Sequence, residues 1–295
     1  MTSAKIKDKA ATVILYCISV FVLILLLSLI GYIIYNGRHS LNVKFLFGSP
    51  KFGEAGGGIG PMLFNSFYLL LVSLIITIPL GIGAGIYLSE YAKEGFLLNA
   101  IRLCIETMAS LPSIVVGLFG LIVFVKMTGG YNLISGALAI TVLNLPSMTR
   151  VSENAIKAAA AGVKEASLGL GATKWQTIRR VILPSAIPQV LTGIILAAGR
   201  IFGEAAALLY TAGMSAPPLR FNNISLVNKA SAFSLFRPAE TLAVYIWKMN
   251  SEASVPDAAQ IAGGASAVLI IMVLLFNVLA RIIGKAIYRS YTGSK

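Results

Sequence analysis

Residues 10–37 read AATVILYCISVFVLILLLSLIGYIIYNG, an apolar run without a single charged side chain. A helix needs about 20 mostly apolar residues to cross the hydrocarbon core of a bilayer. The apolar part of a secretory signal peptide has only about 7–15 residues. This run is longer, follows three lysines, and ends in Tyr32-Ile33-Ile34-Tyr35, where aromatic rings suit the membrane interface. The stretch therefore predicts a retained transmembrane helix over 10–35, with residues 1–9 in the cytoplasm.

Five further runs are apolar and long enough to cross a bilayer. They cover residues 55–89, 107–125, 127–149, 181–199 with an extension beyond Arg200, and 258–280. We expect the second helix to begin near Met62, after Pro61, and the third to begin near Leu98. The third then takes in Arg102 and Glu106, whose four-residue spacing favours an ion pair within that helix. The prediction is an all-α membrane protein with six transmembrane helices.

The composition supports a membrane protein and locates its two faces. The chain is 57% hydrophobic and only 12% charged, with a mean hydropathy of +0.84, whereas a soluble domain has about 25% charged residues. Disorder is excluded because it needs low hydrophobicity. Of the 24 Lys and Arg, fifteen fall in segments that this topology places inside and eight in outer segments. This bias predicts that both termini are cytoplasmic, and it explains the net charge of +13 without nucleic acid.

The segments between the spans complete the predicted organisation. An outer loop covers 36–61, a core of five spans covers 62–285, and a cytoplasmic tail covers 286–295. Within the core, a cytoplasmic loop covers 151–184 and an outer loop covers 213–257. The outer loop contains the apolar stretch Thr241–Trp247, which is too short to cross a membrane and is interpreted as an interfacial or re-entrant helix. The two cysteines lie in or beside apolar runs and indicate neither a disulfide framework nor a metal site.

The cytoplasmic loop 151–184 has the pattern of two helices around a tight turn. An alanine-rich, helix-favouring stretch leads to Gly171, placed where a left-handed helix terminus favours glycine. Thr173 and Gln176 then match a capping box for a second helix, which we expect to end near Leu183 because Pro184 interrupts it. The side chains of Trp175, Arg179 and Arg180 would face a partner or lipid headgroups. The alternative is an ordinary basic, helical inner loop.

Two opposite charges lie inside the fifth apolar span, at Arg200 and Glu204. A charged side chain at bilayer depth costs at least about 2.5–3.5 kcal/mol, so such a residue is a candidate for function. The spacing places both on one helix face together with Gly199 and Gly203, which remove bulk and admit a helix or a hydrated ligand. Guanidinium groups fit oxyanions, so we expect an anion pathway; a structural ion pair is the alternative. Arg150 is either a second anion contact or an interfacial anchor.

The cytoplasmic loop also resembles a known motif. The sequence Glu165-Ala166-Ser167, followed after three residues by Gly171 and after nine more by Val181-Ile182-Leu183-Pro184, is similar to the EAA loop of ATP-binding-cassette (ABC) importer permeases. Ser167 and Val181 depart mildly from that pattern. The resemblance implies a type I importer permease fold in which this loop docks on an ATPase subunit. Glu165, Ala166 and Gly171 would belong to the contact, and Pro184 would set the bend into the next span.

Two further stretches resemble the PstA-type permeases of phosphate importers. They are Leu111–Phe119 and Gly199–Gly213, and the similarity extends over nearly the whole chain. The commoner form in that family has Thr-Ala-Pro after Gly-Glu, where this chain has Ala205-Ala206-Ala207. The resemblance implies that Arg150 and Arg200 serve phosphate passage, with Glu204 beside them. It also implies a complex with a second, PstC-like permease, PstB-like ATPase subunits and an external PstS-like phosphate-binding protein.

Other functions fit the sequence less well. The chain has no Gly-x-x-x-x-Gly-Lys-Ser/Thr loop, so ATP must be hydrolysed by a partner chain, and no cofactor is expected here. An intramembrane enzyme is disfavoured because His39 is the one histidine and no hydrolase or zinc motif occurs. A passive channel or scaffold would not need the cytoplasmic loop. The closest alternative is a permease for another oxyanion, such as sulfate or molybdate, or for another small solute.

Overall fold

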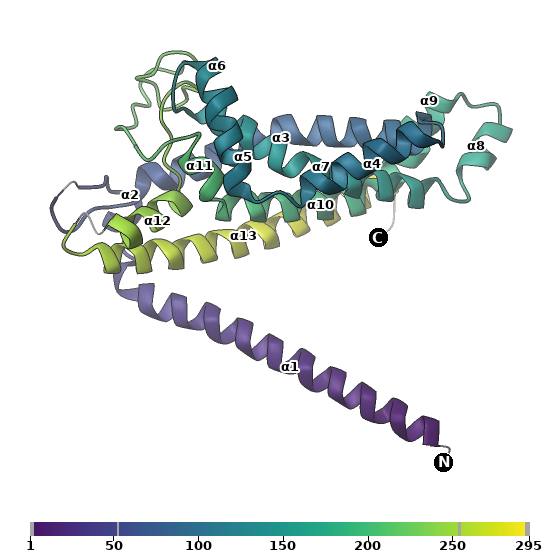
Figure 1. Cartoon of the computed structure of the whole chain (residues 1–295), viewed down its shortest axis with the longest axis horizontal. Coiled ribbons are helices and arrows are strands. Elements are labelled where there is room, and N and C mark those ends of the chain that lie inside the picture. The colour runs from purple at the N-terminus through teal and green to yellow at the C-terminus, as the bar shows by residue number, and fades with distance from the viewer. Residues whose placement is uncertain (1–2, 52, 253–254, 293–295) are drawn as a thin grey trace.

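The computed structural model describes residues 3–51, 53–252 and 255–292, and these residues form helices, turns and loops without a strand. The predicted all-α class is therefore confirmed. The outermost residues of the predicted N-terminal segment and tail, 1–2 and 293–295, lie outside the described residues. Figure 1 shows long helices running side by side, with short helices and loops gathered at the two ends.

The centre of the bundle is the pair α3 (Gly60–Ile86) and α7 (Leu133–Ala160). Pro61 occupies the first turn of α3, as expected, because proline there gives up no helical hydrogen bond. Gly81 and Gly85 let the two helices approach closely: a Cβ at Gly85 would lie 2.5 Å from the Ser152 Cβ. The helices α10 (Leu183–Gly203) and α13 (Ala258–Thr292) pack beside this pair (Figure 1).

The first helix, α1 (Ser3–Gly37), stands apart from the bundle (Figure 1). The C-terminal end of α1 contacts the first turns of α13. The lack of a side chain at Gly37 allows α1 to approach Gly263 and Ala267 there. Its long apolar side chains are exposed along most of its length. Such a surface needs lipid or a partner around it.

Four stretches of helix are long and apolar enough to cross a membrane: Lys7–Ser40, Gly60–Tyr91, Lys174–Gly203 and Ala258–Ala286. Two further helical stretches, Phe96–Ala109 and Ser113–Thr128, form a bent pair. If this bent pair counts as one span, the number of candidate spans is five. Most of the fourth predicted run, 127–149, lies in α7, which begins at Leu133 and is long but more polar and mostly buried. The count of six spans therefore stays a prediction, as does the side of each terminus.

The bent pair corrects the expectation of one continuous third span. The helix α4 (Phe96–Ala109) and the stretch Ser113–Thr128 meet at an angle of 98°. That stretch consists of α5 (Ser113–Gly120), the π turn η3 (Leu121–Val125) and α6 (Lys126–Thr128). The break falls at Pro112, which lacks an N–H and disfavours helical geometry in the residue before it. An apolar run does not reveal this bend, although the proline does.

The end of the bundle that carries residues 151–184 is called the inner end, after its predicted side. It contains α8 (Lys164–Gly169), α9 (Lys174–Thr177), the π turn η4 (Ile178–Ile182) and, at the end of α3, the π turn η2 (Tyr87–Tyr91). The alanine-rich stretch is not one helix, because the chain turns at Gly162 with a left-handed φ of 83°. Pro184 does not interrupt the second helix either. The chain stays helical from Lys174 to Gly203, and the wide π turn just before Pro184 accommodates its ring.

The opposite, outer end holds short elements from the two predicted outer loops and from the residues that directly follow α10. They are η1 (Arg38–Ser40), α2 (Val43–Phe47), α11 (Ala206–Leu209) and α12 (Leu242–Glu252). The helix expected around Thr241–Trp247 is present as α12, and it buries Leu242, Val244 and Tyr245 against the rest of the fold. The backbone N–H of Leu242 donates to Ser66 Oγ on α3 at 2.9 Å, which anchors the start of α12.

Candidate transport pathway and coupling segment

The geometry expected for Arg200 and Glu204 is wrong. The helix α10 ends at Gly203, and Glu204 has an extended backbone with ψ of 121°. The Glu204 side chain instead accepts a hydrogen bond from the backbone N–H of Ala207 at 3.3 Å, at the start of α11. The two charged residues therefore do not share a helix face. A carboxylate near a helix end competes with helical carbonyls for backbone N–H groups. The bond from the Ala207 N–H to Glu204 therefore ends α10, although this chain lacks the proline that the commoner family sequence has just after Gly-Glu.

Arg200 lies on an open face of α10. Its side chain is exposed, and it makes no ion pair among the described residues. A Cβ built at Gly199 or Gly203 would meet no described atom within 4 Å. The small residues thus leave space beside Arg200 that this chain does not fill.

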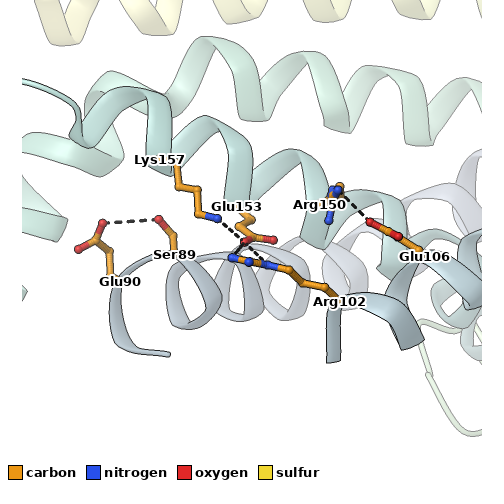
Figure 2. A network of polar contacts seen from close by, with 7 residues as sticks. All are labelled: Ser89, Glu90, Arg102, Glu106, Arg150, Glu153 and Lys157. Atoms are coloured by element: carbon orange, nitrogen blue, oxygen red, sulfur yellow. Dashed lines mark hydrogen bonds and ion pairs between the residues drawn. The ribbon is translucent and has the colours of Figure 1, made fainter. Parts of the chain in front are cut away.

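Arg150, on α7, forms an ion pair with Glu106, which the sequence spacing predicted to pair with Arg102. Its Nη2 lies 2.9 Å from Glu106 Oε1 on α4, and the two side chains are 43% and 57% exposed. Figure 2 shows this pair across the gap between α7 and α4. The expected ion pair between Arg102 and Glu106 is therefore wrong. Spacing along one helix cannot reveal a partner on the helix that packs against it.

Arg102 belongs to a second, closed network one turn further along α7. Its Nε and Nη2 donate to Glu153 Oε1 at 3.0 and 2.6 Å, and Lys157 Nζ donates to the same oxygen at 2.7 Å (Figure 2). Burial alone would raise the pKa of Glu153, but the hydrogen bonds and charges of Lys157 and Arg102 outweigh it and lower the pKa. This network, centred on the buried carboxylate of Glu153, fastens α4 to α7.

The surroundings of Arg150 are polar on the side that faces outward. Ser147 and Asn154 are exposed and lie three and four residues from Arg150, hence on the same face of α7. A face toward lipid would carry apolar side chains, because charged groups in hydrocarbon are costly. This stripe of Ser147, Arg150 and Asn154 therefore fits a hydrated path or a protein partner.

The coupling segment, residues 151–184, has the local structure that the sequence predicts around its turn. Gly171 adopts a left-handed φ of 86°. Thr173 Oγ1 accepts from the Gln176 N–H at 3.3 Å, and Gln176 Oε1 accepts from the Thr173 N–H at 2.9 Å, which completes the capping box. Both short helices are thus set at a fixed angle by glycine and by two reciprocal hydrogen bonds.

This segment presents an unusual surface for a loop in water. Glu165, Ala166 and Gly171 are exposed, whereas Pro184 is half-buried at the start of α10. Leu170 is 90% exposed and Trp175 is also exposed. Large exposed apolar side chains on one short segment are typical of surfaces that bind another protein. The arrangement fits a docking surface formed by α8 and α9.

Sequence reasoning missed the buried charges at the outer end. Arg237, counted there as a loop residue, is 2% exposed and donates through Nη2 to Asn65 Oδ1 at 2.7 Å. Its Nε and Nη1 donate to the carbonyls of Ala232 and Pro238. Asn65 in turn donates to the Glu240 carbonyl at 2.9 Å. The signal that could have found this site is Asn65-Ser66, a polar pair inside an apolar span that needs partners.

Apolar helices of bilayer length, an open face with arginines and an exposed helical loop segment together fit the class of multi-pass membrane permeases. The chain belongs to the family of binding-protein-dependent transport system inner membrane components, whose model matches residues 77–293. It is 50% identical over 291 residues to the probable ABC transporter permease protein YqgI of Bacillus subtilis, covering 98% of this chain and 99% of that protein. It is 34% identical to the phosphate transport system permease protein PstA of Yersinia pestis, covering 80% and 75%.

Solved structures show the same fold at low sequence identity. A chain of a bacterial alginate ABC transporter, solved with an alginate-bound periplasmic protein, matches with a TM-score of 0.65 and 16% identity over 96% of both chains. A chain of the MetNI methionine ABC transporter matches with a TM-score of 0.56 and 19% identity, covering 78% of this chain and 94% of that one. The expectation of an ABC importer permease is therefore confirmed. The chain is an inner-membrane transporter subunit rather than an enzyme.

Proposed function

We propose that this chain is the PstA-type permease subunit of an ABC importer for inorganic phosphate and forms half of the translocation pathway. The observation that carries the proposal is Arg200, an exposed cation on α10 beside the open space at Gly199 and Gly203. A guanidinium binds the oxygens of phosphate through paired N–H groups. The relatives named as phosphate permeases support the choice of anion.

The two arginines would act in sequence along the path. Gly193 of α10 packs against Val151 of α7, next to Arg150. Arg200 is seven residues beyond Gly193 toward the outer end, or about 10 Å at 1.5 Å per residue. An entering anion would therefore meet Arg200 first and Arg150 second. Both side chains are exposed, so each holds the anion weakly enough to release it, as conduction requires.

The remaining parts of the path would come from partner chains. A second, PstC-like permease would cover the open face of α7 and α10 and close the pathway. PstB-like ATPase subunits would bind α8 and α9 and hydrolyse ATP, with no cofactor bound by this chain. A PstS-like protein would deliver phosphate at the outer end, and both termini would lie in the cytoplasm. Glu204 would contribute by ending α10 beside Arg200 rather than by pairing with it.

The test is ATP-dependent uptake of radiolabelled phosphate and sulfate by vesicles that hold the assembled complex. Arg200→Gln should abolish phosphate uptake while assembly and ATP hydrolysis persist. Arg220→Gln is the control, because Arg220 is exposed in the predicted outer loop and lies outside the proposed path. Normal uptake by Arg200→Gln would overturn the role of Arg200. Uptake of sulfate or molybdate in place of phosphate would favour the alternative, a permease for another oxyanion.

A further inference from the structure

Glu90 is a buried carboxylate at the inner end that the transport pathway does not use. It lies in η2, where the π turn ends the long helix that begins with α3. Its side chain is only 3% exposed. A buried carboxylate costs free energy unless it is paired, so its partners indicate its role.

Two lysines of the coupling segment bind Glu90, and its neighbour Ser89 makes a weak hydrogen bond to Oε1 at 3.5 Å (Figure 2). Lys164 Nζ, at the start of α8, lies 2.7 Å from Glu90 Oε2. Lys174, at the start of α9, donates a hydrogen bond through Nζ to the Glu90 carbonyl. The Lys174 ammonium also lies 4.6 Å from the centre of the Tyr91 ring, a cation–π distance. Glu90 thus binds the first residue of α8 through its carboxylate and the first residue of α9 through its backbone carbonyl.

The rest of the coupling segment is joined to itself and to the bundle by separate contacts. Ser167 Oγ and Thr177 Oγ1 lie 2.9 Å apart and connect α8 to the end of α9. Ile178 and Ile182 are buried in an apolar cluster at the inner end, with Ile86 of α3 packed against it. The exposed helix α8 has its described side-chain link to the α3 helix through Lys164 and Glu90.

A displacement of α8 would reach α3 directly through the Glu90 contacts, and indirectly through α9 and the apolar cluster at the inner end. The helix α3 would pass it on, because its close contacts at Gly81 and Gly85 fix it against α7. An ion pair at 2.7 Å around a buried carboxylate is a stiff connection compared with an exposed pair, whose long side chains stay mobile. The position suits transmission better than docking, since the carboxylate is covered and an ATPase could not touch it.

We propose that Glu90 is a positioning residue that transmits movement of the coupling segment to α3. This inference rests on the proposed docking of residues 151–184 to an ATPase, and it holds for any transported anion. Removing the charge at Glu90 should leave docking and ATP hydrolysis in place and weaken their connection to the membrane helices. The complex would then hydrolyse ATP with fewer anions transported per ATP.

The experiment compares Glu90→Gln with the parent complex in vesicles, measuring assembly, ATP hydrolysis and phosphate uptake together. We expect uptake per ATP to fall about 5-fold or more, the lower end of the usual coupling between two sites. Glu94→Gln is the matched control, because Glu94 is exposed and makes no ion pair among the described residues. A ratio equal to that of the parent would overturn the proposal. So would a proportional loss of hydrolysis and uptake in an assembled complex, which a purely structural role predicts.

A second variant covers the case in which Glu90→Gln does not assemble. Lys164→Gln removes the other half of the pair from a partly exposed position, and it should lower uptake per ATP as well. In the double variant the ratio should fall no further, since one connection is lost in each case. A normal ratio in Lys164→Gln would contradict the proposal. If the parent transports sulfate and not phosphate, the proposed substrate is wrong, and the same ratio measured with sulfate still tests Glu90.

Discussion

The two arginines of the proposed pathway differ in whether a carboxylate already neutralises them. Arg150 has a carboxylate partner, Glu106, at 2.9 Å, whereas Arg200 makes no ion pair among the described residues. Both members of the Arg150 pair are about half exposed, and an exposed pair of this kind contributes only about 0.2–1 kcal/mol. An anion could therefore displace Glu106 and take its place. Glu106 would act as an internal competitor that limits how tightly Arg150 holds phosphate.

Replacing Glu106 should strengthen phosphate binding at Arg150. In Glu106→Gln the guanidinium has no carboxylate to release, so the affinity should rise about 2–5-fold, the equivalent of a weak exposed pair. The measurement is the phosphate concentration that half-protects Arg150 from phenylglyoxal, with the modified peptide quantified by mass spectrometry. Glu94→Gln should leave that concentration unchanged. An unchanged value in Glu106→Gln would show that the pair does not compete with phosphate.

Glu240 predicts a pH dependence of stability at the outer end. Burial raises its pKa to about 7, although Lys248 at 3.4 Å lowers it in part. Because the folded-state pKa lies above the ordinary value, the folded form is favoured at low pH and loses stability as pH rises through about 7. The expected loss between pH 6 and 8 is about 1 kcal/mol.

Thermal unfolding followed by tryptophan fluorescence can measure this loss, since Trp247 lies in α12 close to Glu240 in the chain. Trp175 is replaced by Phe to remove the second signal. The difference between pH 6 and pH 8 should shrink in Glu240→Gln, which cannot ionise. It should persist in large part in Glu252→Gln, at the C-terminal end of α12, because the Glu252 charge is the smallest of the causes that act on the Glu240 pKa. An identical pH dependence in Glu240→Gln and the parent would assign the effect to other groups.

Single residues also show which features of the site could be predicted from the sequence. Arg150, Arg200 and the capping box at Thr173 follow from rules about neighbours in the chain, and the structure contains that capping box. The partners of Glu106, Arg102 and Glu90 lie on other helices. No spacing along the chain encodes those contacts, so the ion pairs that matter most for the proposed mechanism required the fold.

At the scale of whole elements, apolar runs predicted most long helices and missed their interruptions. The breaks at Pro112 and Gly162 come from single residues that an average over a long run hides. Pro184 was expected to break a helix and does not, because the π turn at 178–182 gives its ring room. Glu204 ends α10 through a bond to the backbone of the next helix. Such breaks depend on local backbone geometry rather than on hydropathy.

The packing of α3 against α7 can be tested by substituting two glycines of α3, one in contact with α7 and one in open space. A Cβ at Gly85 would lie 2.8 Å from the Glu153 backbone nitrogen, whereas a Cβ at Gly83 would meet no described atom within 4 Å. Gly85→Ala should therefore destabilise the chain by about 1–3 kcal/mol through overpacking. Gly83→Ala should stabilise it by about 0.5–1 kcal/mol, since alanine favours a helix.

Thermal unfolding of the two glycine variants in detergent would compare them directly. Opposite signs are expected, and the loss in Gly85→Ala should be accompanied by weaker contact between α3 and α7. If both substitutions stabilise the chain equally, the two helices do not approach as closely as the structure shows.

At the scale of the whole molecule, contacts between distant segments define two ends. At one end Glu90 binds Lys164, and Arg102 binds Glu153. At the other end the backbone N–H groups of Asn132 and Leu133 donate to the carbonyls of Thr211 and Arg237. The helix α4 is fastened to the first end, and Thr128, at the end of the bent pair, bonds to Asn132 at the second. The bent pair thus leads from one end to the other, as a membrane span would.

This arrangement argues for six spans, which labelling with a membrane-impermeant thiol reagent can test. In a background with Cys17→Ser and Cys104→Ser, single variants Lys93→Cys, Lys126→Cys and Lys229→Cys are compared in intact cells and in inverted vesicles. If the bent pair and α7 both cross, Lys93→Cys is labelled only from the cytoplasm, and Lys126→Cys and Lys229→Cys only from outside. A re-entrant pair would place positions 93 and 126 on the same side, and the predicted six-span topology would then be wrong. The two parts have 14 and 16 residues, about 21 and 24 Å of helix, and meet at 98°. Bent by that angle they still reach about 30 Å from end to end, the thickness of the hydrocarbon core.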